Sequence, residues 1–404
     1  MSDPASPTST RNPILWGAYL ACSWTWCIGM FLPALLLRDM GWAGFLIFAL
    51  PNVIGAAAMG WIIPSRADSV RFVDNHPNAI WWFSAITLAF HLFWIIWITN
   101  FIGAAFHIPT PYLAGGIGIV LFFALISRRG IRRGQAPQIA LTLLIFSLGV
   151  LIATTCTPDV QESNAALFDS APTSLAPLWM LPVMLFGFLL CPYLDITFHH
   201  ARQQLDTKKN GRLGFSIGFI GFFSFMILLT ARYAGAMAGA MDGAMDGTGF
   251  APIATPWLAT GILIHILCQW GFTVRVHLKH IQTLPGAKSK QPVLLLLALI
   301  AGVAGFLTIH LPSYAGLTGG EIVYRLFMSA YGLGFPAYVL YRVVMARKNK
   351  TPIGMPTLWI AIALASPLFW MGFIERHPLW LIPGMALVLL GAFIPRPKRS
   401  SDGR

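Results

Sequence analysis

Charged side chains are scarce in this sequence. Only 10% of its 404 residues are Asp, Glu, Lys or Arg, whereas a soluble globular protein has roughly 25%. Hydrophobic residues make up 56% of the chain. This composition excludes an ordinary soluble domain and predicts an integral membrane protein. The length of the chain therefore cannot be used to count soluble domains.

Sequence motifs for common chemistry are also missing. The chain has no P-loop, no H-E-x-x-H and no G-x-S-x-G. Its five cysteines lie in or beside apolar segments without metal-ligand spacing, and they are interpreted as small buried residues. They are Cys22, Cys27, Cys156, Cys191 and Cys268. We therefore expect no resident cofactor, and no metal ligand is assigned.

The N-terminal segment has no basic start of the kind that a cleaved signal peptide needs. Residues 1–13 are interpreted as a short disordered cytoplasmic tail. The net charge of +13 would suit a nucleic-acid partner. The basic residues, however, form short clusters between apolar runs, where membrane topology explains them. We expect the lipid bilayer, and no nucleic acid, to be the large partner.

A membrane-spanning helix needs about 20 mostly apolar residues. Twelve segments meet this condition, and the protein is predicted to be an all-α polytopic membrane protein. The predicted spans are 14–37, 41–63, 79–105, 111–127, 137–157, 176–200, 213–233, 255–276, 292–310, 322–345, 356–374 and 378–395.

The basic residues predict the orientation of these helices. With the N-terminus inside, 23 of the 27 Lys and Arg residues fall on cytoplasmic segments. The four exceptions are Arg38, Arg232, Arg325 and Arg376. Because cytoplasmic loops are rich in Lys and Arg, both termini are predicted to be cytoplasmic. A bacterial-type inner membrane is the expected location.

Ionisable groups inside the bilayer are costly, and they are functional hypotheses by default. Asp195 lies near the predicted cytoplasmic end of the span 176–200. His91 and His265 lie near the middle of their spans, with Gln269 one turn after His265 on the same face. These four residues are our candidates for coupling or gating. Structural alternatives are an ion pair for Asp195 and hydrogen-bonded packing for the histidines.

Two spans contain candidate breaks, the feature with which transporters hold a substrate at mid-membrane. One is "CSWTWCIGMFLP" at 22–33, and the other is "LPVMLFGFLLCP" at 181–192, where Gly187 lies between two prolines. A hydroxyl or backbone group at either break could bind a solute, and aromatic rings could form apolar walls. The predicted substrate-binding residues are Ser23, Trp24, Thr25, Trp26, Gly29, Phe186, Gly187 and Phe188.

Twelve helices with breaks in the first and sixth resemble the LeuT-fold transporters. The segment after the second break resembles the sodium/solute symporter family in particular, through Asp195, Thr197, Ala201, Arg202 and Lys208. A second similar run is Trp42, Pro51, Asn52 and Gly55, followed by Arg66 and Arg71.

The resemblance implies two inverted five-helix repeats, at 14–175 and 176–345. Two further helices lie in 346–395, and a basic cytoplasmic tail occupies 396–404. It also implies a symporter that moves a small solute by alternating access. The family's sodium site uses hydroxyls on the eighth helix, where this chain has only Thr260 and Thr273. The coupling ion is therefore Na⁺, or a proton carried by Asp195 or His265.

Two other functions stay open at this point. The first is a membrane transferase, with His199 or His200 acting as a general base beside Asp195 at the cytoplasmic face. The second is a sensor derived from a transporter that no longer moves solute. The sequence predicts neither the identity of the solute nor the oligomeric state.

Overall fold

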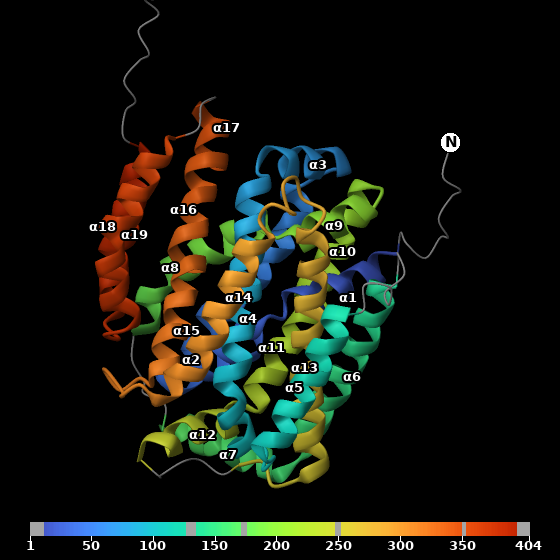
Figure 1. Ribbon diagram of the computed structural model, residues 1–404, viewed down its shortest axis with the longest axis vertical. Helices are drawn as coiled ribbons and strands as arrows, with labels where there is room; N and C mark the ends of the chain where they lie inside the picture. The colour runs from blue at the N-terminus through green and yellow to red at the C-terminus, as the bar shows by residue number, and fades with distance from the viewer. Residues whose placement is uncertain (1–11, 127–134, 171–175, 247–251, 350–352, 394–404) are drawn as a thin grey trace, which may run out of the picture.

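The computed structural model describes residues 12–126, 135–170, 176–246, 252–349 and 353–393 (Figure 1). The predicted tail at 396–404 lies outside this part of the chain, as do residues 1–11 of the tail at 1–13. The described residues form helices, and the isolated bridge between Tyr314 and Leu317 is the only extended pairing among them.

The helices before the second break are α1 Pro13–Trp24, α2 Cys27–Ile62, α3 Arg66–Asn75, α4 Pro77–Ala105, α5 Thr110–Ile126, α6 Ala136–Cys156, α7 Pro158–Ser170 and α8 Ala176–Leu190. The helices after it are α9 Ile196–Gln204, α10 Lys208–Ser216, α11 Ser224–Arg232, α12 Ala234–Asp246, α13 Pro256–Ile281, α14 Gln291–Leu307, α15 Gly319–Ser329, α16 Phe335–Val339, α17 Met345–Asn349, α18 Met355–Phe373 and α19 Leu381–Phe393. Short turns of other helix types are η2 Cys191–Leu194, η3 Ile217–Phe223, η4 Thr308–His310, η5 Ala330–Gly334, η6 Leu340–Val344 and η7 Pro378–Trp380.

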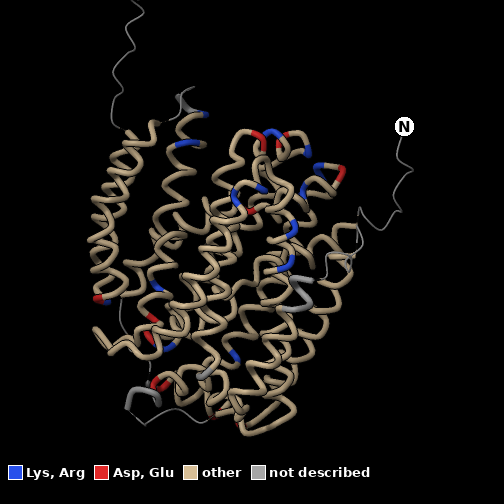
Figure 2. Tube along the Cα trace, viewed as in Figure 1, with Lys and Arg blue, Asp and Glu red and all other residues tan. Residues whose placement is uncertain are grey.

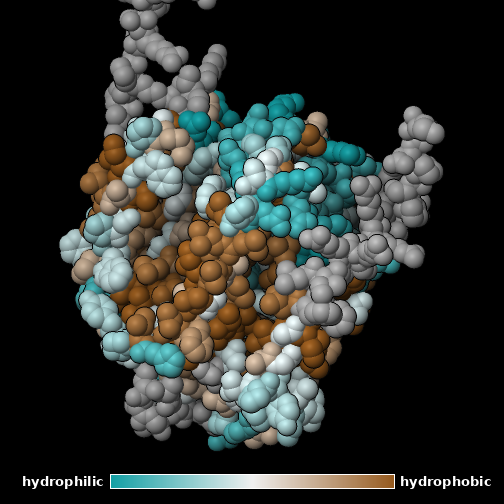
Figure 3. All heavy atoms as spheres, in the orientation of Figure 1, coloured by the Kyte–Doolittle hydropathy of each residue, from teal (hydrophilic) through white to brown (hydrophobic). Residues whose placement is uncertain are grey.

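Eight segments of the described chain are helical, long and apolar enough to cross a membrane, and two shorter apolar helices accompany them. The middle of the visible face is hydrophobic and the hydrophilic residues gather toward its ends (Figure 3). The prediction of a helical, multi-pass membrane protein is therefore confirmed. The count of twelve spans, the position of the termini and the inverted repeat stay predictions.

The 36-residue helix α2 contains parts of two predicted spans, 14–37 and 41–63. They meet at Gly41, whose φ of 61° lies in the left-handed region and interrupts the helical path. Glycine adopts this conformation without the clash that a Cβ atom would cause. The chain can therefore change direction at Gly41, between the two predicted spans.

The first predicted break lies where it was expected. Helix α1 ends at Trp24, and α2 begins at Cys27, so that Thr25 and Trp26 are not helical. Asn12 caps the start of α1, because its side chain accepts a hydrogen bond from the Ile14 amide at 2.8 Å. The apolar α1, buried from Trp16 to Trp24, thus stops about halfway along the predicted span 14–37.

The second break lies at the end of its predicted segment instead of at its centre. Helix α8 continues through Pro182 and Gly187 to Leu190, and η2 and Asp195 then separate it from α9. Pro192 lacks an amide hydrogen and cannot continue the ladder of α8. Asp195 starts the new helix by accepting from the Thr197 amide at 2.7 Å. The predicted span 176–200 is therefore two helices joined by a bend.

Most Lys and Arg residues of the described chain gather at one end of the molecule, near α3, α9 and α10 (Figure 2). We call this the α3 end. The opposite end carries α7 and α12 (Figure 1), and we call it the α12 end. This uneven distribution is the pattern on which the predicted orientation depends.

Candidate functional site

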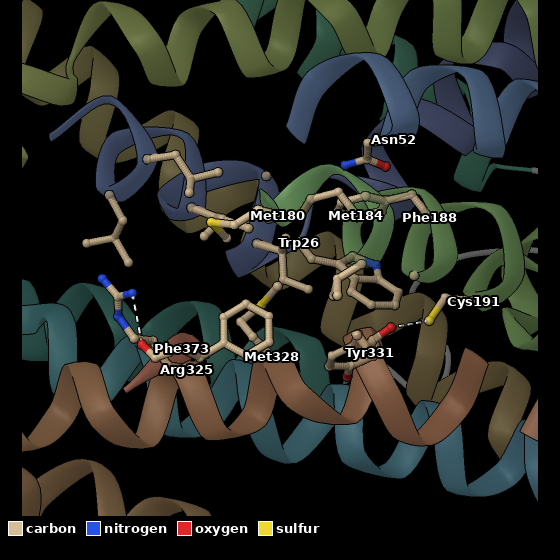
Figure 4. A pocket seen from close by; sticks show the side chains of 18 of the residues that line it. Trp26, Asn52, Met180, Met184, Phe188, Cys191, Arg325, Met328, Tyr331 and Phe373 are labelled. Atoms are coloured by element: carbon tan, nitrogen blue, oxygen red, sulfur yellow. Dashed lines mark hydrogen bonds between the residues drawn. The ribbon is translucent and has the colours of Figure 1, made fainter. Parts of the chain in front are cut away.

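A cavity of about 60 Å³ lies among α2, α8, α15 with η5, and the end of α18 (Figure 4). Arg325 lies at one end of it, and Cys191 lies at the other end beside the second break. The lining residues are Trp24, Trp26, Ile28, Gly29, Leu32, Leu35, Leu36, Asp39, Asn52, Met180, Val183, Met184, Gly187, Phe188, Cys191, Arg325, Met328, Tyr331, Gly332 and Phe373. This volume holds a few water molecules, so a larger solute requires the walls to move.

The walls of the cavity are aromatic rings, methionine side chains and branched aliphatic side chains. Met180, Met184 and Met328 face it from two helices (Figure 4). Methionine is unbranched and polarizable, so these walls can adapt their shape to an apolar group. Polar groups are confined to its two ends, with Asn52 near the breaks and Arg325 opposite. Such a cavity suits a solute with an apolar body and a polar end.

The first break is held by the two tryptophans on either side of Thr25. Trp24 Nε1 donates to Asn52 Oδ1 at 2.7 Å, and Trp26 Nε1 donates to the Ser23 carbonyl at 2.7 Å. His91 Nε2 lies 3.3 Å from the Cys27 amide, and its Nδ1 lies 2.7 Å from the Thr87 carbonyl. These distances assign the Nδ1–H tautomer to His91, which then accepts the first amide of α2.

The Trp26 ring lies in the centre of this region. Its centroid is 5.5 Å from those of Phe83 and Tyr331, 5.7 Å from that of His277 and 6.2 Å from that of His91. Edge-to-face contacts at such distances are favourable for aromatic rings. Trp26 therefore joins the first break to α4, α13 and η5, and any opening of the site has to break these contacts.

The second break contacts the first through hydroxyl groups. Thr197 Oγ1 lies 2.6 Å from Asp195 Oδ1 and 3.1 Å from Ser23 Oγ at the end of α1. All three side chains are fully buried. The two breaks therefore touch at this point.

The predicted substrate-binding residues divide into two groups. Trp24, Trp26, Gly29, Gly187 and Phe188 line the cavity, and their role in binding stays a prediction. Ser23, Thr25 and Phe186 are buried but do not belong to the lining. The hydroxyls of Ser23 and Thr25 donate to carbonyls of α1 one turn earlier, so they help to end that helix.

The predicted coupling residues also lie in different places. Asp195 and His91 are at the breaks. His265 instead contacts α6, where its Nδ1 lies 2.8 Å from Ser147 Oγ. Gln269 reaches the end of α1, and its amide lies 3.6 Å from Cys22 Sγ. The structure therefore brings two of these four residues to the breaks and sets His265 against the neighbouring helix.

The histidines of the alternative enzyme site have other partners. The His199 ring stacks on Phe72, and its Nδ1 lies 3.0 Å from Ser69 Oγ. The His200 ring lies 4.1 Å from that of His280. Within the described residues, His, Cys, Asp and Glu form no group of three that could hold a metal ion.

An ion-pair network closes the end of the cavity that faces the α12 end. Glu321 of α15 lies 2.6 Å from Arg38 and 2.8 Å from Arg325, and its side chain is fully buried. Asp39 lies 2.5 Å from Arg325 and 3.6 Å from Arg376. Because Asp39 and Arg325 also line the cavity, the network separates it from the α12 end.

Sequence reasoning missed His277 and most of this network. The predicted eighth span ended at residue 276, whereas α13 continues to Ile281. His277 follows Thr273 by four residues, and both are fully buried, so the helical spacing was a usable signal. The network joins two local pairs, Arg38 with Asp39 and Glu321 with Arg325, and nothing in the sequence links one pair to the other.

Arg202 fastens the end of α9 to the end of α2. Its guanidinium donates to the carbonyls of Ile63 at 2.9 Å, Pro64 at 2.6 Å and Leu205 at 2.5 Å. Only 1% of the residue is exposed, and this burial lowers the pKa of the guanidinium from its usual value. The end of α9 is therefore held by a buried clamp of hydrogen bonds from the Arg202 side chain to the backbone.

Replacing Arg202 with methionine should destabilise the protein, because several buried carbonyls lose their donors. An unpaired buried polar group costs about 1–3 kcal/mol. We expect the apparent Tm in detergent to fall by several degrees. Arg71→Met removes an exposed arginine, whose side chain is 73% exposed, and should leave Tm unchanged. Equal Tm values for both variants would contradict the clamp.

The comparisons with known proteins give a likeness in structure. The chain matches no known family model and no curated protein. It is similar to the solved structure titled "Crystal structure of MhsT in complex with L-phenylalanine", a LeuT-fold transporter, with 15% sequence identity and a TM-score of 0.44. The match covers 93% of this chain and 98% of that one. The likeness is divergent, and the function proposed below is derived from the chain's own site.

Proposed function

We propose that this protein is a secondary transporter that moves a small amphipathic solute across a bacterial-type inner membrane. The observation that supports this proposal is that two interrupted helices meet at a buried cavity within a helical membrane protein. Interrupted helices expose backbone groups at membrane depth only where they line a cavity, which is how transporters bind solutes. A gradient of sodium ions or protons would drive the movement.

The α3 end is proposed to face the cytoplasm, because it carries most of the basic residues. The ion-pair network then forms the outer gate of the cavity. Solute would enter when Arg38 and Arg325 separate from Glu321. It would leave toward the α3 end when α1 and α9, which touch through Ser23 and Thr197, move away from α4 and α13.

The chemistry of the cavity favours a solute with an apolar or aromatic body. Met184, Phe188 and Tyr331 would contact that body, and the face of Trp26 could also accept a cationic group. Asn52 would meet the polar end beside the breaks. These contacts support a small solute as the partner.

Reconstitution into proteoliposomes tests the proposal. We expect uptake or counterflow of at least one member of a panel of labelled amphipathic solutes with neutral, cationic and aromatic members. Trp26→Phe removes the hydrogen bond to the Ser23 carbonyl and should reduce that rate about tenfold, since about 1.4 kcal/mol corresponds to a factor of ten.

Trp61→Phe is the matched control, because Trp61 is 47% exposed on α2 outside the cavity, and its transport rate should stay unchanged. Size-exclusion chromatography of both variants checks that they are folded. Absence of uptake and counterflow across the whole panel by the folded wild-type protein would refute the transporter.

A further inference from the structure

A buried acid and a buried imidazole face each other beside the two breaks. Asp195 Oδ2 lies 3.9 Å from His277 Nε2, which is too long for a hydrogen bond. Both side chains are fully buried, and neither of these two atoms has a hydrogen-bond partner in the structure. A buried polar atom without a partner costs about 1–3 kcal/mol, so two that face each other need an explanation.

The other polar atoms of the two side chains are already engaged. Asp195 Oδ1 accepts from the amide and the hydroxyl of Thr197. His277 Nδ1 lies 3.3 Å from Ser84 Oγ on α4. These contacts fix both side chains, so the gap between Oδ2 and Nε2 is a defined position in the interior.

We propose that Asp195 and His277 together hold one transported proton, which couples solute movement to the proton gradient. This inference rests on the proposed transporter function and names its coupling ion. With the proton, the pair is neutral overall, as a carboxylic acid beside a neutral imidazole, the form that avoids separated charges in the interior. Without it, the pair carries one negative charge. A buried negative charge is costly, so the loaded pair favours the closed site.

The ligand chemistry favours a proton over a metal cation. Hard cations need several oxygen ligands, but only one carboxylate oxygen of Asp195 is open here, and a ring nitrogen faces it. The Thr273 hydroxyl, one turn before His277 on α13, donates to the Cys22 carbonyl at 3.3 Å. Histidine and a buried carboxyl are the side chains that exchange protons near neutral pH.

The pair also lies where a proton can control movement. Asp195 and Thr197 belong to the second break and touch α1 through Ser23, whereas His277 belongs to α13 and touches α4 through Ser84. The gap therefore crosses the boundary between the interrupted helices and their neighbours. A proton shared by Asp195 and His277 holds these two groups of helices together. Loss of the proton leaves a negative charge on the pair, which water can solvate when the site opens.

Other titratable groups surround the pair. Tyr19 of α1 and Tyr331 of η5 are close enough to interact with the charge of Asp195. His91 of α4 and His280 of α13 are close enough to interact with that of His277. His91 has both ring nitrogens engaged with the backbone. The proton is therefore assigned to Asp195 and His277, which each have an atom without a hydrogen-bond partner.

Infrared difference spectroscopy between alkaline and acidic pH tests the proton site without a solute. The reconstituted protein should show a carboxylic-acid carbonyl band from a buried group on acidification. Asp195→Asn should abolish this band, and His277→Gln should shift the pH at which it forms. His199→Gln is the control, because His199 is an equally buried histidine with both nitrogens paired, and it should change neither property.

A band that persists in Asp195→Asn would overturn the proposal, as would a band whose pH dependence is the same in His277→Gln as in the wild type. The isosteric Asn can still accept from the Thr197 amide, so this variant should fold. The second arm measures proteoliposome uptake of the solute found above, with and without an inward proton gradient. Wild-type uptake should rise at least about tenfold with the gradient, and Asp195→Asn should lose this response.

The two arms separate the failure of this inference from the failure of the proposed function. Uptake that needs sodium and ignores the proton gradient would refute the proton site but keep the transporter. An Asp195 band in a protein that transports no member of the panel would support proton binding and refute the transporter.

Discussion

Replacing Glu321 with alanine is expected to open the cavity from the α12 end. Glu321 is the buried acid between Arg38 and Arg325, at 2.6 Å and 2.8 Å. Removing one partner of a buried ion pair typically costs 3–5 kcal/mol, because the remaining charge is left without compensation. Here two guanidinium groups would lose an acid. Asp39 contacts both Arg38 and Arg325, but it alone would then have to balance two guanidinium groups.

The native cysteines provide the measurement. Cys191 lines the cavity and is buried, whereas Cys156 is exposed. A membrane-impermeant methanethiosulfonate, added to the face that carries α12, should modify Cys191 at least about ten times faster in Glu321→Ala, and mass spectrometry of its peptide reports the rate. The rate at Cys156 should not change and serves as an internal reference.

A matched control comes from an exposed acid. Asp68 lies 4.0 Å from Arg71 in an exposed pair, and such pairs contribute about 0–1 kcal/mol. Asp68→Ala should therefore leave the reactivity of Cys191 unchanged. If Glu321→Ala is folded and Cys191 is still protected, the network is not the gate.

The fold followed from the sequence where the signal is local. Apolar runs predicted the helices, and the small and polar residues around Thr25 predicted the first break at the correct place. The second break was misplaced because Pro182 and Gly187 resemble helix breakers. Pro182 lies in the interior of α8, and the helix continues through it, because membrane helices tolerate proline where neighbouring groups satisfy the freed carbonyl. The bend depends on Pro192 together with the capping carboxylate of Asp195, a combination that counts of Pro and Gly do not detect.

The site was less predictable because its parts are distant in the sequence. Asp39 and Arg325 contact each other across 286 positions. His277 fell outside the predicted span 255–276, because charged residues lie near it in the sequence. The buried face of α13 nevertheless continues through this segment. Predictions from hydropathy find where a helix is apolar. They do not find which polar side chains of different helices meet, because that depends on packing.

Replacing Gly55 with alanine should disrupt the contact between α2 and α8, and with it the site. A Cβ atom at Gly55 would lie 2.1 Å from the Phe188 carbonyl oxygen. The obstacle is backbone, so no side-chain rotation can relieve the clash, and the two helices must separate. Overpacking a filled interior typically costs 1–3 kcal/mol, and a rigid neighbour puts this variant at the upper end or beyond. Phe188 lines the cavity three residues before Cys191, so the shift also displaces the second break.

We expect Gly55→Ala to lower the apparent Tm in detergent and to abolish uptake in proteoliposomes. Gly149→Ala on α6 is the matched control, because no atom lies within 4 Å of the position of its new Cβ. Alanine is favoured over glycine inside a helix by about 0.5–1 kcal/mol, so the control should be as stable as the wild type or slightly more stable. The change from glycine to alanine is thus predicted to lower stability at Gly55 and to keep or raise it at Gly149. Equal stability of the two variants would show that α2 and α8 do not pack backbone to backbone at Gly55, and the cavity described between them would then lose its support.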